Sequence, residues 1–107
     1  MSVAWQSSAW VDVSEEHGTL VLRICGELDM ASRDAIEPVV TAAIATVDSV
    51  NLDLAGLTFC DSSGLALLIA ASQKVEANGS SLSVSNMQAA VRRVFDIAGL
   101  GELIRVE

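Results

Sequence analysis

Hydrophobic positions recur with a strand-like period in some stretches of this chain and with a helical period in others. Residues 10–14 and 81–85 alternate between apolar and polar side chains, which is the pattern of a half-buried strand. Residues 19–25 are more apolar, as central strands are, and predict the second strand. Residues 50–54 predict the third strand. Residues 103–106 are the candidate for one more short strand at an edge of the sheet.

Helical periodicity marks three further segments. In the first, apolar residues spaced by three and four positions run from residue 36 to residue 47, with Ser32 as the expected N-cap. Pro38 removes a backbone hydrogen bond from this segment, so we expect a distorted first turn or a later start. The second helix should run from about residue 63 to residue 77, because Asn78-Gly79 is a good left-handed stop.

The remaining connections carry their own signals. Residues 85–88 (Ser-Asn-Met-Gln) have the spacing of a capping box and should open a third helix with an apolar stripe from Met87 to Ala98. Gly99, with an apolar residue behind it, is typical of a helix stop. Residues 15–18 predict a hairpin turn between the first two strands, since their glycine tolerates a positive φ.

The order of elements is therefore β-β-α-β-α-β-α, with a possible last strand. One helix between the second and third strands makes a crossover, so these strands should be parallel and their connection right-handed. The sequence predicts an α/β protein with a single mixed β-sheet of four to five strands covered by α-helices. At 107 residues the chain has room for one domain, 1–107, with residues 1–9 as a loosely ordered lead-in.

Two polar loops follow strands of this predicted sheet. Residues 26–29 (Gly-Glu-Leu-Asp) come after the second strand, and residues 61–64 (Asp-Ser-Ser-Gly) stand where the third strand gives way to the second helix. The carboxyl ends of parallel strands share one edge, so both loops should meet there. Ser62 or Ser63 can cap the helix, and a helix start also favours phosphate. From these residues alone, a plain helix cap and a functional site are equally good interpretations.

Composition narrows the classes of partner. The formal net charge is -8 and 51% of the residues are hydrophobic. Nucleic acids and anionic membranes are bound through clustered Lys and Arg, so neither is expected as the main partner. The longest apolar run, residues 65–71, is far short of the ~20 residues of a membrane-spanning helix. Residues 1–5 show no basic region of a signal peptide, and we expect a cytoplasmic protein.

Catalytic chemistry is not expected. A nucleophilic serine needs a base, but His17 lies in the predicted hairpin turn and Lys74 lies about three turns along the second helix. Gly-x-Ser-x-Gly and phosphate-binding glycine runs are absent. Cys25 and Cys60 stand in apolar runs without a nearby His or Cys at ligand spacing, which favours buried free thiols. We predict no catalytic residue, no metal site and no cofactor.

A modified serine is the remaining functional idea. A phosphoryl group adds about -1.5 to -2 charge at neutral pH. At the predicted edge it would lie near Asp61 and Asp29, where a closely packed partner would be repelled while the helix start tolerates the charge. Such a combination is what a binding switch requires.

Three motifs give the chain a resemblance to a known family. They are residues 26–29, residues 61–65 (Asp-Ser-Ser-Gly-Leu) and residues 91–100 (Val-Arg-Arg-Val-Phe-Asp-Ile-Ala-Gly-Leu), and with their spacing they cover most of residues 10–106. The chain resembles a STAS domain, specifically the stand-alone bacterial anti-sigma-factor antagonists.

The resemblance implies a partner-switching cycle. In that family the unphosphorylated antagonist binds an anti-sigma factor and frees the sigma factor. The anti-sigma factor is also a Ser/Thr kinase that phosphorylates the antagonist and ends the complex, and a PP2C-type phosphatase resets it. By position, the phosphorylated hydroxyl is that of Ser62, with Ser63 the runner-up. Ala66 replaces a glycine that is common in the family, and its methyl group would limit how closely a kinase approaches.

Two functions follow for this chain. In the first it is a phosphorylation-controlled binding protein. In the second it is a non-phosphorylated STAS scaffold, or a subunit of a larger regulatory or transport complex, in which residues 61–64 only cap a helix. The residues expected to contact a partner are Glu27, Asp29, Asp61, Ser62, Ser63, Gly64 and Leu65.

Overall fold

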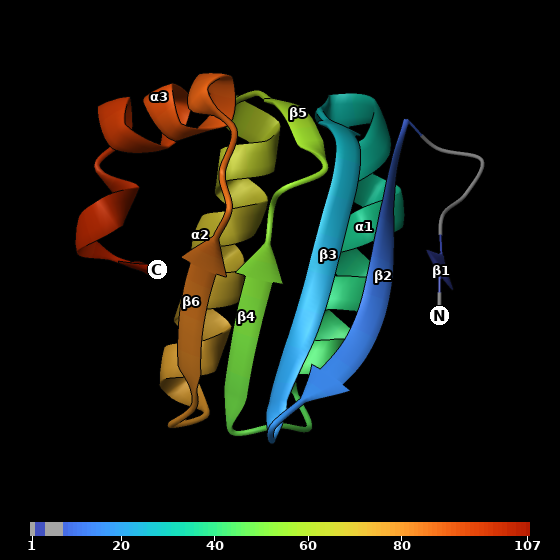
Figure 1. The fold of residues 1–107 in the computed structure, drawn as a ribbon, viewed down its shortest axis with the longest axis vertical. Helices are drawn as coiled ribbons and strands as arrows, with labels where there is room; N and C mark the ends of the chain where they lie inside the picture. The colour runs from blue at the N-terminus through green and yellow to red at the C-terminus, as the bar shows by residue number, and fades with distance from the viewer. Residues whose placement is uncertain (1, 4–7) are drawn as a thin grey trace.

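A computed structural model, which describes residues 2–3 and 8–107, places the strands in one sheet. The strands are β1 (Ser2–Val3), β2 (Ala9–Glu16), β3 (Thr19–Leu28), β4 (Ser49–Asp53), β5 (Leu57–Cys60), β6 (Ser81–Ser85) and β7 (Arg105–Val106). The helices are α1 (Met30–Ile44), α2 (Ser62–Ala77) and α3 (Ala89–Ile97), followed by the 3-10 turn η1 (Leu100–Glu102). Helices α1 and α2 lie side by side behind the sheet, and α3 lies above the end of β6 (Figure 1).

The strand order is β1-β2-β3-β4-β6-β7, and β5 pairs with the last part of β3. The first three strands are antiparallel, whereas β3, β4, β6 and β7 pair in parallel. The predicted mixed α/β sheet is therefore confirmed, together with its four main strands and the short edge strand near the C-terminus. Strands β1 and β5 are additional to the predicted set.

The lead-in predicted over residues 1–9 lies partly outside the described residues, which omit 1 and 4–7. Within it, β1 pairs with β2, and Ala9 is already a buried residue of β2.

The hairpin turn between β2 and β3 consists of His17 and Gly18, with φ values of 53° and 81°. Two successive residues with positive φ form the turn that matches the twist of paired strands. The two strands pair in register from Glu16↔Thr19 to Ala9↔Gly26, which confirms the predicted hairpin.

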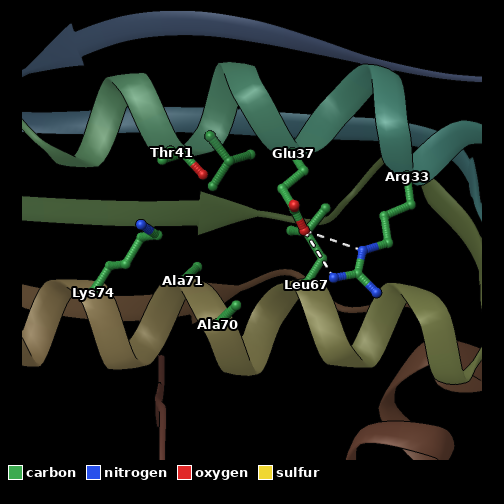
Figure 2. A pocket seen from close by; sticks show the side chains of 8 residues that line it. Arg33, Glu37, Thr41, Leu67, Ala70, Ala71 and Lys74 are labelled. Atoms are coloured by element: carbon green, nitrogen blue, oxygen red, sulfur yellow. Dashed lines mark hydrogen bonds and ion pairs between the residues drawn. The ribbon is translucent and has the colours of Figure 1, made fainter.

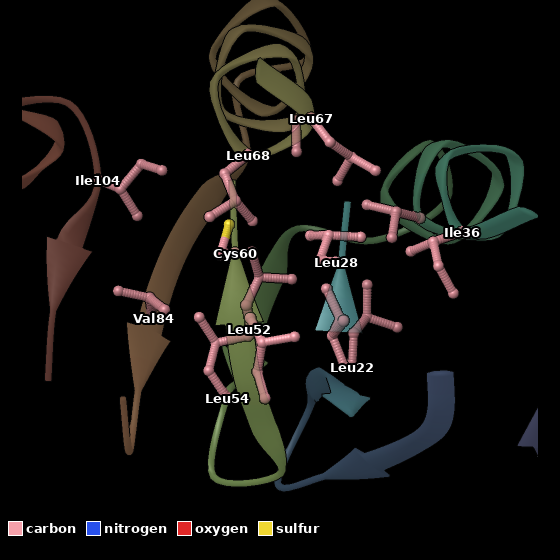
Figure 3. Packing of buried hydrophobic residues seen from close by; sticks show 14 of the residues in the cluster. Leu22, Leu28, Ile36, Leu52, Leu54, Cys60, Leu67, Leu68, Val84 and Ile104 are labelled. Carbon is pink, nitrogen blue, oxygen red and sulfur yellow. The ribbon is translucent and has the colours of Figure 1, made fainter. Parts of the chain in front are cut away.

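The core lies between the sheet and helices α1 and α2 (Figure 3). Leu22 of β3 and Leu52 of β4 face Ile36 of α1 and Leu68 of α2, and all four side chains are 0% exposed. Burying an aliphatic side chain of this size stabilises a fold by about 1.5–3 kcal/mol. This layer holds α1 and α2 against the sheet.

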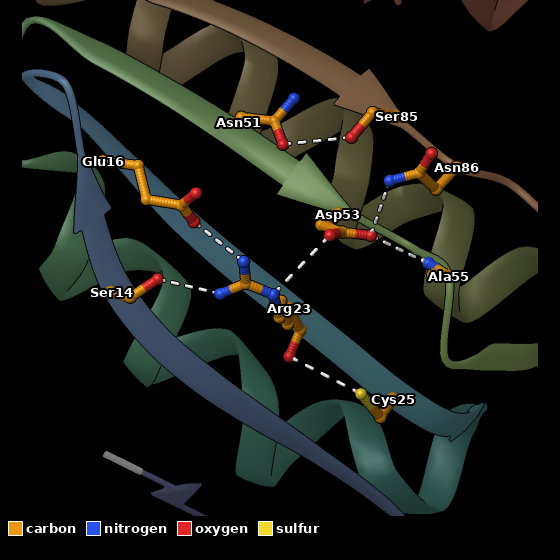
Figure 4. A network of polar contacts seen from close by, with 9 residues as sticks. All are labelled: Ser14, Glu16, Arg23, Cys25, Asn51, Asp53, Ala55, Ser85 and Asn86. Atoms are coloured by element: carbon orange, nitrogen blue, oxygen red, sulfur yellow. Dashed lines mark hydrogen bonds and ion pairs between the residues drawn. The ribbon is translucent and has the colours of Figure 1, made fainter.

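The other face of the sheet is polar (Figure 4). Arg23 donates to Ser14 Oγ at 2.8 Å and to Glu16 Oε2 at 2.8 Å, and its Nε lies 3.6 Å from Asp53 Oδ2. These contacts join β2, β3 and β4. Because the Arg23 side chain is 40% exposed, solvent screens the charges, and the network orients the strands more than it stabilises them.

Helix α1 corrects the expectation for Pro38. The helix begins at Met30 and continues through Pro38 to Ile44, with neither a distorted first turn nor a late start. Pro38 lies on the exposed side of α1, where Asp34, four residues earlier, is also exposed. Water can therefore hydrate the carbonyl that loses its donor, which lowers the cost of an interior proline.

Helix α3 corrects the predicted capping box. The helix begins at Ala89 with Gln88 as its N-cap, and no side chain caps it. The Ser85 hydroxyl instead donates to Asn51 Oδ1 at 3.0 Å, because Ser85 still belongs to β6. The predicted stop is confirmed, since Gly99 has a φ of 73°.

Candidate functional site at the ends of β3 and β5

Strands β3 and β5 run parallel and end side by side. Glu27 is paired with Phe59 and Leu28 with Cys60, and the backbone N–H of Asp61 donates to the Leu28 carbonyl at 3.2 Å. The two polar loops therefore meet at one edge of the sheet, as predicted, although residues 61–64 follow β5 and not the predicted third strand, β4, which ends at Asp53. We call this edge, residues 26–30 with residues 58–63, the rim.

An aspartate at the end of each strand caps the helix that follows. Asp29 accepts from the Ser32 N–H at 2.9 Å, and the Ser32 hydroxyl accepts from the Asp29 N–H at 3.0 Å, a reciprocal capping box. Asp61 Oδ1 accepts from the N–H groups of Ser63 and Gly64, at 2.8 and 3.1 Å. Each aspartate satisfies N–H groups that a helix start otherwise leaves unpaired.

These caps overturn the cap predicted for each helix. Ser32 is not the N-cap of α1 but its third residue, and neither Ser62 nor Ser63 is the N-cap of α2. The reason is backbone geometry. Asp61 is extended, with φ -98° and ψ -170°, so its carboxylate turns back over the first turn, whereas Ser62 and Ser63 are already inside the helix.

The hydroxyl of Ser62 takes no part in capping α2. Ser62 is the first residue of α2 and is exposed, and its hydroxyl forms no hydrogen bond within the described part of the chain. Ser63 is half-buried. The hydroxyl of Ser62 is therefore the more accessible of the two.

The rim also brings two helix starts together. Helices α1 and α2 begin at Met30 and Ser62, each one residue after its capping aspartate. The backbone dipoles of a helix leave about half a positive charge at its N-terminus, so an anion at this edge is favoured by two helices. The carboxylates of Asp29 and Asp61 already use part of that field.

Gly64 supports the rim from below. It is buried, and a Cβ at this position would lie 2.6 Å from Cys60 Sγ and 2.9 Å from the Leu28 carbonyl oxygen. Only glycine lets α2 approach the strand ends this closely. Gly64 therefore shapes the site without offering a side chain to a partner, and Leu65, half-buried, packs against the core.

Two apolar residues of the rim escaped the sequence analysis. Met30 is 76% exposed and Phe59 is 48% exposed. Phe59 points outward because β5 contains one more residue than β3 between Gly26↔Leu57 and Glu27↔Phe59, a bulge at Thr58. A signal was present in the sequence: Leu57 and Cys60 are three residues apart, so a regular strand cannot place both side chains on the core face of the sheet.

A family model of the STAS domain matches residues 11–107. This chain belongs to the STAS family. An anti-sigma F factor antagonist of Lysinibacillus sphaericus is 36% identical over 85 residues, covering 78% of this chain and 73% of that protein.

Solved structures agree with this assignment. The crystal structure of an anti-sigma factor antagonist from Mycobacterium paratuberculosis matches the STAS domain with a TM-score of 0.85 at 27% identity, covering 97% of this chain and 88% of the other. The antagonist SpoIIAA matches in its unphosphorylated form with a TM-score of 0.76 at 28% identity, covering 91% and 87%. The phosphorylated form of SpoIIAA from Bacillus matches with 0.70 at 27%, covering 91% and 90%.

In the part of the chain that the structure describes, neither His17 nor Lys74 lies near Ser62. His17 lies in the turn at the other end of β3, and Lys74 lies twelve residues further along α2, about 18 Å away. Burial, together with the charge of Asp61, raises the pKa of the Cys60 thiol to about 11, so this thiol is protonated at neutral pH. Cys60 is buried as predicted, but Cys25 is only half-buried.

The described part of the STAS domain contains no group of three or more His, Cys, Asp or Glu residues that could hold a metal ion. Among the described helices, none combines the length and apolar character needed to cross a membrane. A small pocket of about 140 Å³ lies between α1 and α2, beside the ion pair of Arg33 and Glu37 at 2.9 Å (Figure 2). None of the predicted site residues lines it.

Proposed function

We propose that this protein is an anti-sigma-factor antagonist that binds an anti-sigma factor through the rim and is released by phosphorylation of Ser62. The observation that carries the proposal is the exposed, unbonded hydroxyl of Ser62 at the first position of α2. Relatives of this chain carry the name of anti-sigma factor antagonist, and one of the matching antagonists has been solved in a phosphorylated form.

The rim supplies the physics of a switch. Phosphate on Ser62 would add about -1.5 to -2 charge beside Asp61, on the positive end of α2. Water hydrates that charge in the free protein, and the cap made by Asp61 does not depend on the Ser62 hydroxyl. In a complex the same charge would lose its water while it lies close to the rim's own carboxylates. Binding therefore weakens while the fold remains.

The partners follow from this mechanism. The kinase would be an anti-sigma factor that uses ATP to phosphorylate Ser62, and a PP2C-type phosphatase would remove the phosphate. The antagonist itself acts by binding in the cytoplasm, without catalysis and without a cofactor. We propose Glu27, Asp29, Asp61 and Ser62 as its contact groups, with Ser63 and Leu65 beside them.

The test is phosphorylation in vitro. The chain is incubated with ATP and, one at a time, with the anti-sigma-factor kinases encoded in its own genome, and the product is analysed by peptide mass spectrometry. We expect one phosphate on Ser62, none in Ser62→Ala, and full incorporation in the matched control Ser63→Ala. Incorporation on Ser63 alone would move the switch by one residue.

Binding is tested separately from phosphorylation. Ser62→Asp should weaken the complex with the kinase about a hundredfold, while its melting temperature stays at the wild-type value because no hydrogen bond is lost. If verified active kinases neither bind nor modify the chain, the protein is a scaffold whose residues 61–64 only start a helix. If Ser62→Asp unfolds the domain, Ser62 is structural.

A further inference from the structure

We infer that Phe59 and Met30 are the apolar anchors of the complex, inserting into apolar pockets on the anti-sigma factor at the edge that also carries Ser62. This inference rests on the proposed function and deepens it. It names the side chains that supply most of the affinity, and the surface of the partner that they require.

The position of Phe59 is set by the bulge in β5. Its neighbours Leu57 and Cys60 are both buried, so the chain must gain one residue between them, and Phe59 is thereby turned to the outside next to Glu27. Phe59 is 48% exposed, so about half of its surface is covered by the protein. A half-held aromatic ring loses little conformational freedom when a partner covers it, and aromatic residues are enriched among binding hot spots.

Met30 belongs to the other segment of the rim, residues 26–30. Leu28 is in register with Cys60, and the two chains continue in the same direction through Asp29 and Asp61 to the first residues of α1 and α2. Met30 and Ser62 are therefore the first residues of two neighbouring helices that start at the same edge of the sheet. The Met30 side chain is 76% exposed, and its flexible thioether adapts to the shape of an apolar pocket.

Single exposed apolar residues are common and require no explanation. Here two of the five large exposed apolar side chains of the described residues stand at the same edge as the phosphorylatable hydroxyl. The bulge shows that the outward direction of Phe59 is built into the sheet. A dianion on Ser62 would lie at the same edge as the two anchors, where a packed partner excludes the water that the charge needs.

Charge identifies the chemistry of the partner surface. Residues 26–30 and 58–63 contain Glu27, Asp29 and Asp61 and no Lys or Arg. A protein surface that fits this rim must therefore present lysine or arginine opposite these carboxylates, while its contact with Ser62 itself must be apolar, so that a phosphate there stays unpaired. An acidic or uniformly apolar surface would leave the carboxylates facing like charges or stripped of water.

The experiment measures the Kd between each variant and a purified anti-sigma factor that binds the wild-type chain, by isothermal titration calorimetry. The variants are Phe59→Ser, Met30→Ser and the double change, and the matched controls are Leu103→Ser and Ile97→Ser. The control side chains are 62% and 81% exposed and belong to the C-terminal part of the chain. Circular dichroism and melting curves establish that each variant is folded.

We expect each rim variant to raise the Kd about tenfold or more, the double variant to raise it further, and the controls to leave it unchanged. Met30→Ser is the decisive variant if Phe59→Ser lowers the melting temperature, because Met30 is hardly packed. Unchanged affinity of folded Met30→Ser and Phe59→Ser, with Ser62 still phosphorylated, overturns this inference and leaves the proposed function standing. If no anti-sigma factor binds the wild type, both fall.

Discussion

At the scale of single residues, the residue of the rim that caps the helix differs from the one that we propose is phosphorylated. Asp61 makes both cap contacts of α2 with one carboxylate oxygen, so the hydroxyl next to it is not needed for the fold. A residue that is modified and restored many times should have no structural contacts to lose. Ser62 meets that requirement. Ser32 does not, because its hydroxyl donates to the backbone carbonyl of Glu27 at 2.8 Å.

Gly64 allows a direct test of how tightly the rim is built. Gly64→Ala should lower the free energy of unfolding by about 1–3 kcal/mol, because the new methyl group overlaps Cys60 Sγ and the Leu28 carbonyl, and the gain in helix propensity of about 1 kcal/mol does not offset this. The measurement is urea denaturation. Gly101→Ala is the control, since nothing lies within 4 Å of a Cβ there, and it should change stability by less than about 0.5 kcal/mol. Equal effects in both variants would contradict the close approach of α2.

At the scale of elements, β5 and the two helix starts make the site. Strand β3 pairs first with β4 and then with β5, so one long strand carries both the centre of the sheet and the rim. Because α1 and α2 cross the same face and start at the same edge, their dipoles act together on any anion bound there. The anchors, the hydroxyl and the carboxylates are thus placed by rigid elements and not by a long loop.

Helix α1 contains an interior proline whose effect can be measured. Pro38→Ala should raise the melting temperature and stabilise the fold by about 1–3 kcal/mol, because residue 38 then donates to the carbonyl of Asp34. Pro38→Gly is the matched control, since it restores the donor but should gain about 1 kcal/mol less owing to the low helix propensity of glycine. A loss of stability in Pro38→Ala would mean that the proline ring, not its missing donor, dominates at this position.

At the scale of the whole molecule, we expect charge to set the rate of association with the partner and apolar contacts to set the rate of dissociation. The chain carries a net charge of -8, and its rim holds three carboxylates without a basic residue. A basic partner is therefore attracted over a distance that salt shortens, since the Debye length is about 10 Å at 0.1 M.

The association rate constant with the anti-sigma factor should fall about tenfold between about 0.05 and 0.5 M salt, while the dissociation rate constant changes little. Stopped-flow or surface plasmon resonance measures both constants. Phe59→Ser should show the opposite signature, with faster dissociation and the wild-type dependence of association on salt. A salt-independent association rate would show that the carboxylates of the rim do not face basic groups.

Much of this architecture was predictable from local pattern. The four main strands, the hairpin at His17-Gly18 and the stop at Gly99 follow from side-chain periodicity and from backbone angles that few residues adopt, both of which are properties of neighbours in the chain. Parallel pairing of the second and third predicted strands follows from the single helix between them. The two polar loops meet because parallel strands end at one edge.

The tertiary structure decided which side chain does what at that edge. Asp29 and Asp61 are the caps because the extended backbone before each helix turns their carboxylates over the first turn. The serines lie within the helices, where the backbone does not allow this geometry. Phe59 faces outward because Leu57 and Cys60 are both buried in the core, which requires a bulge between them. Local sequence carries periodicity and chirality, but competition for the core and for unpaired N–H groups is resolved only when the elements pack.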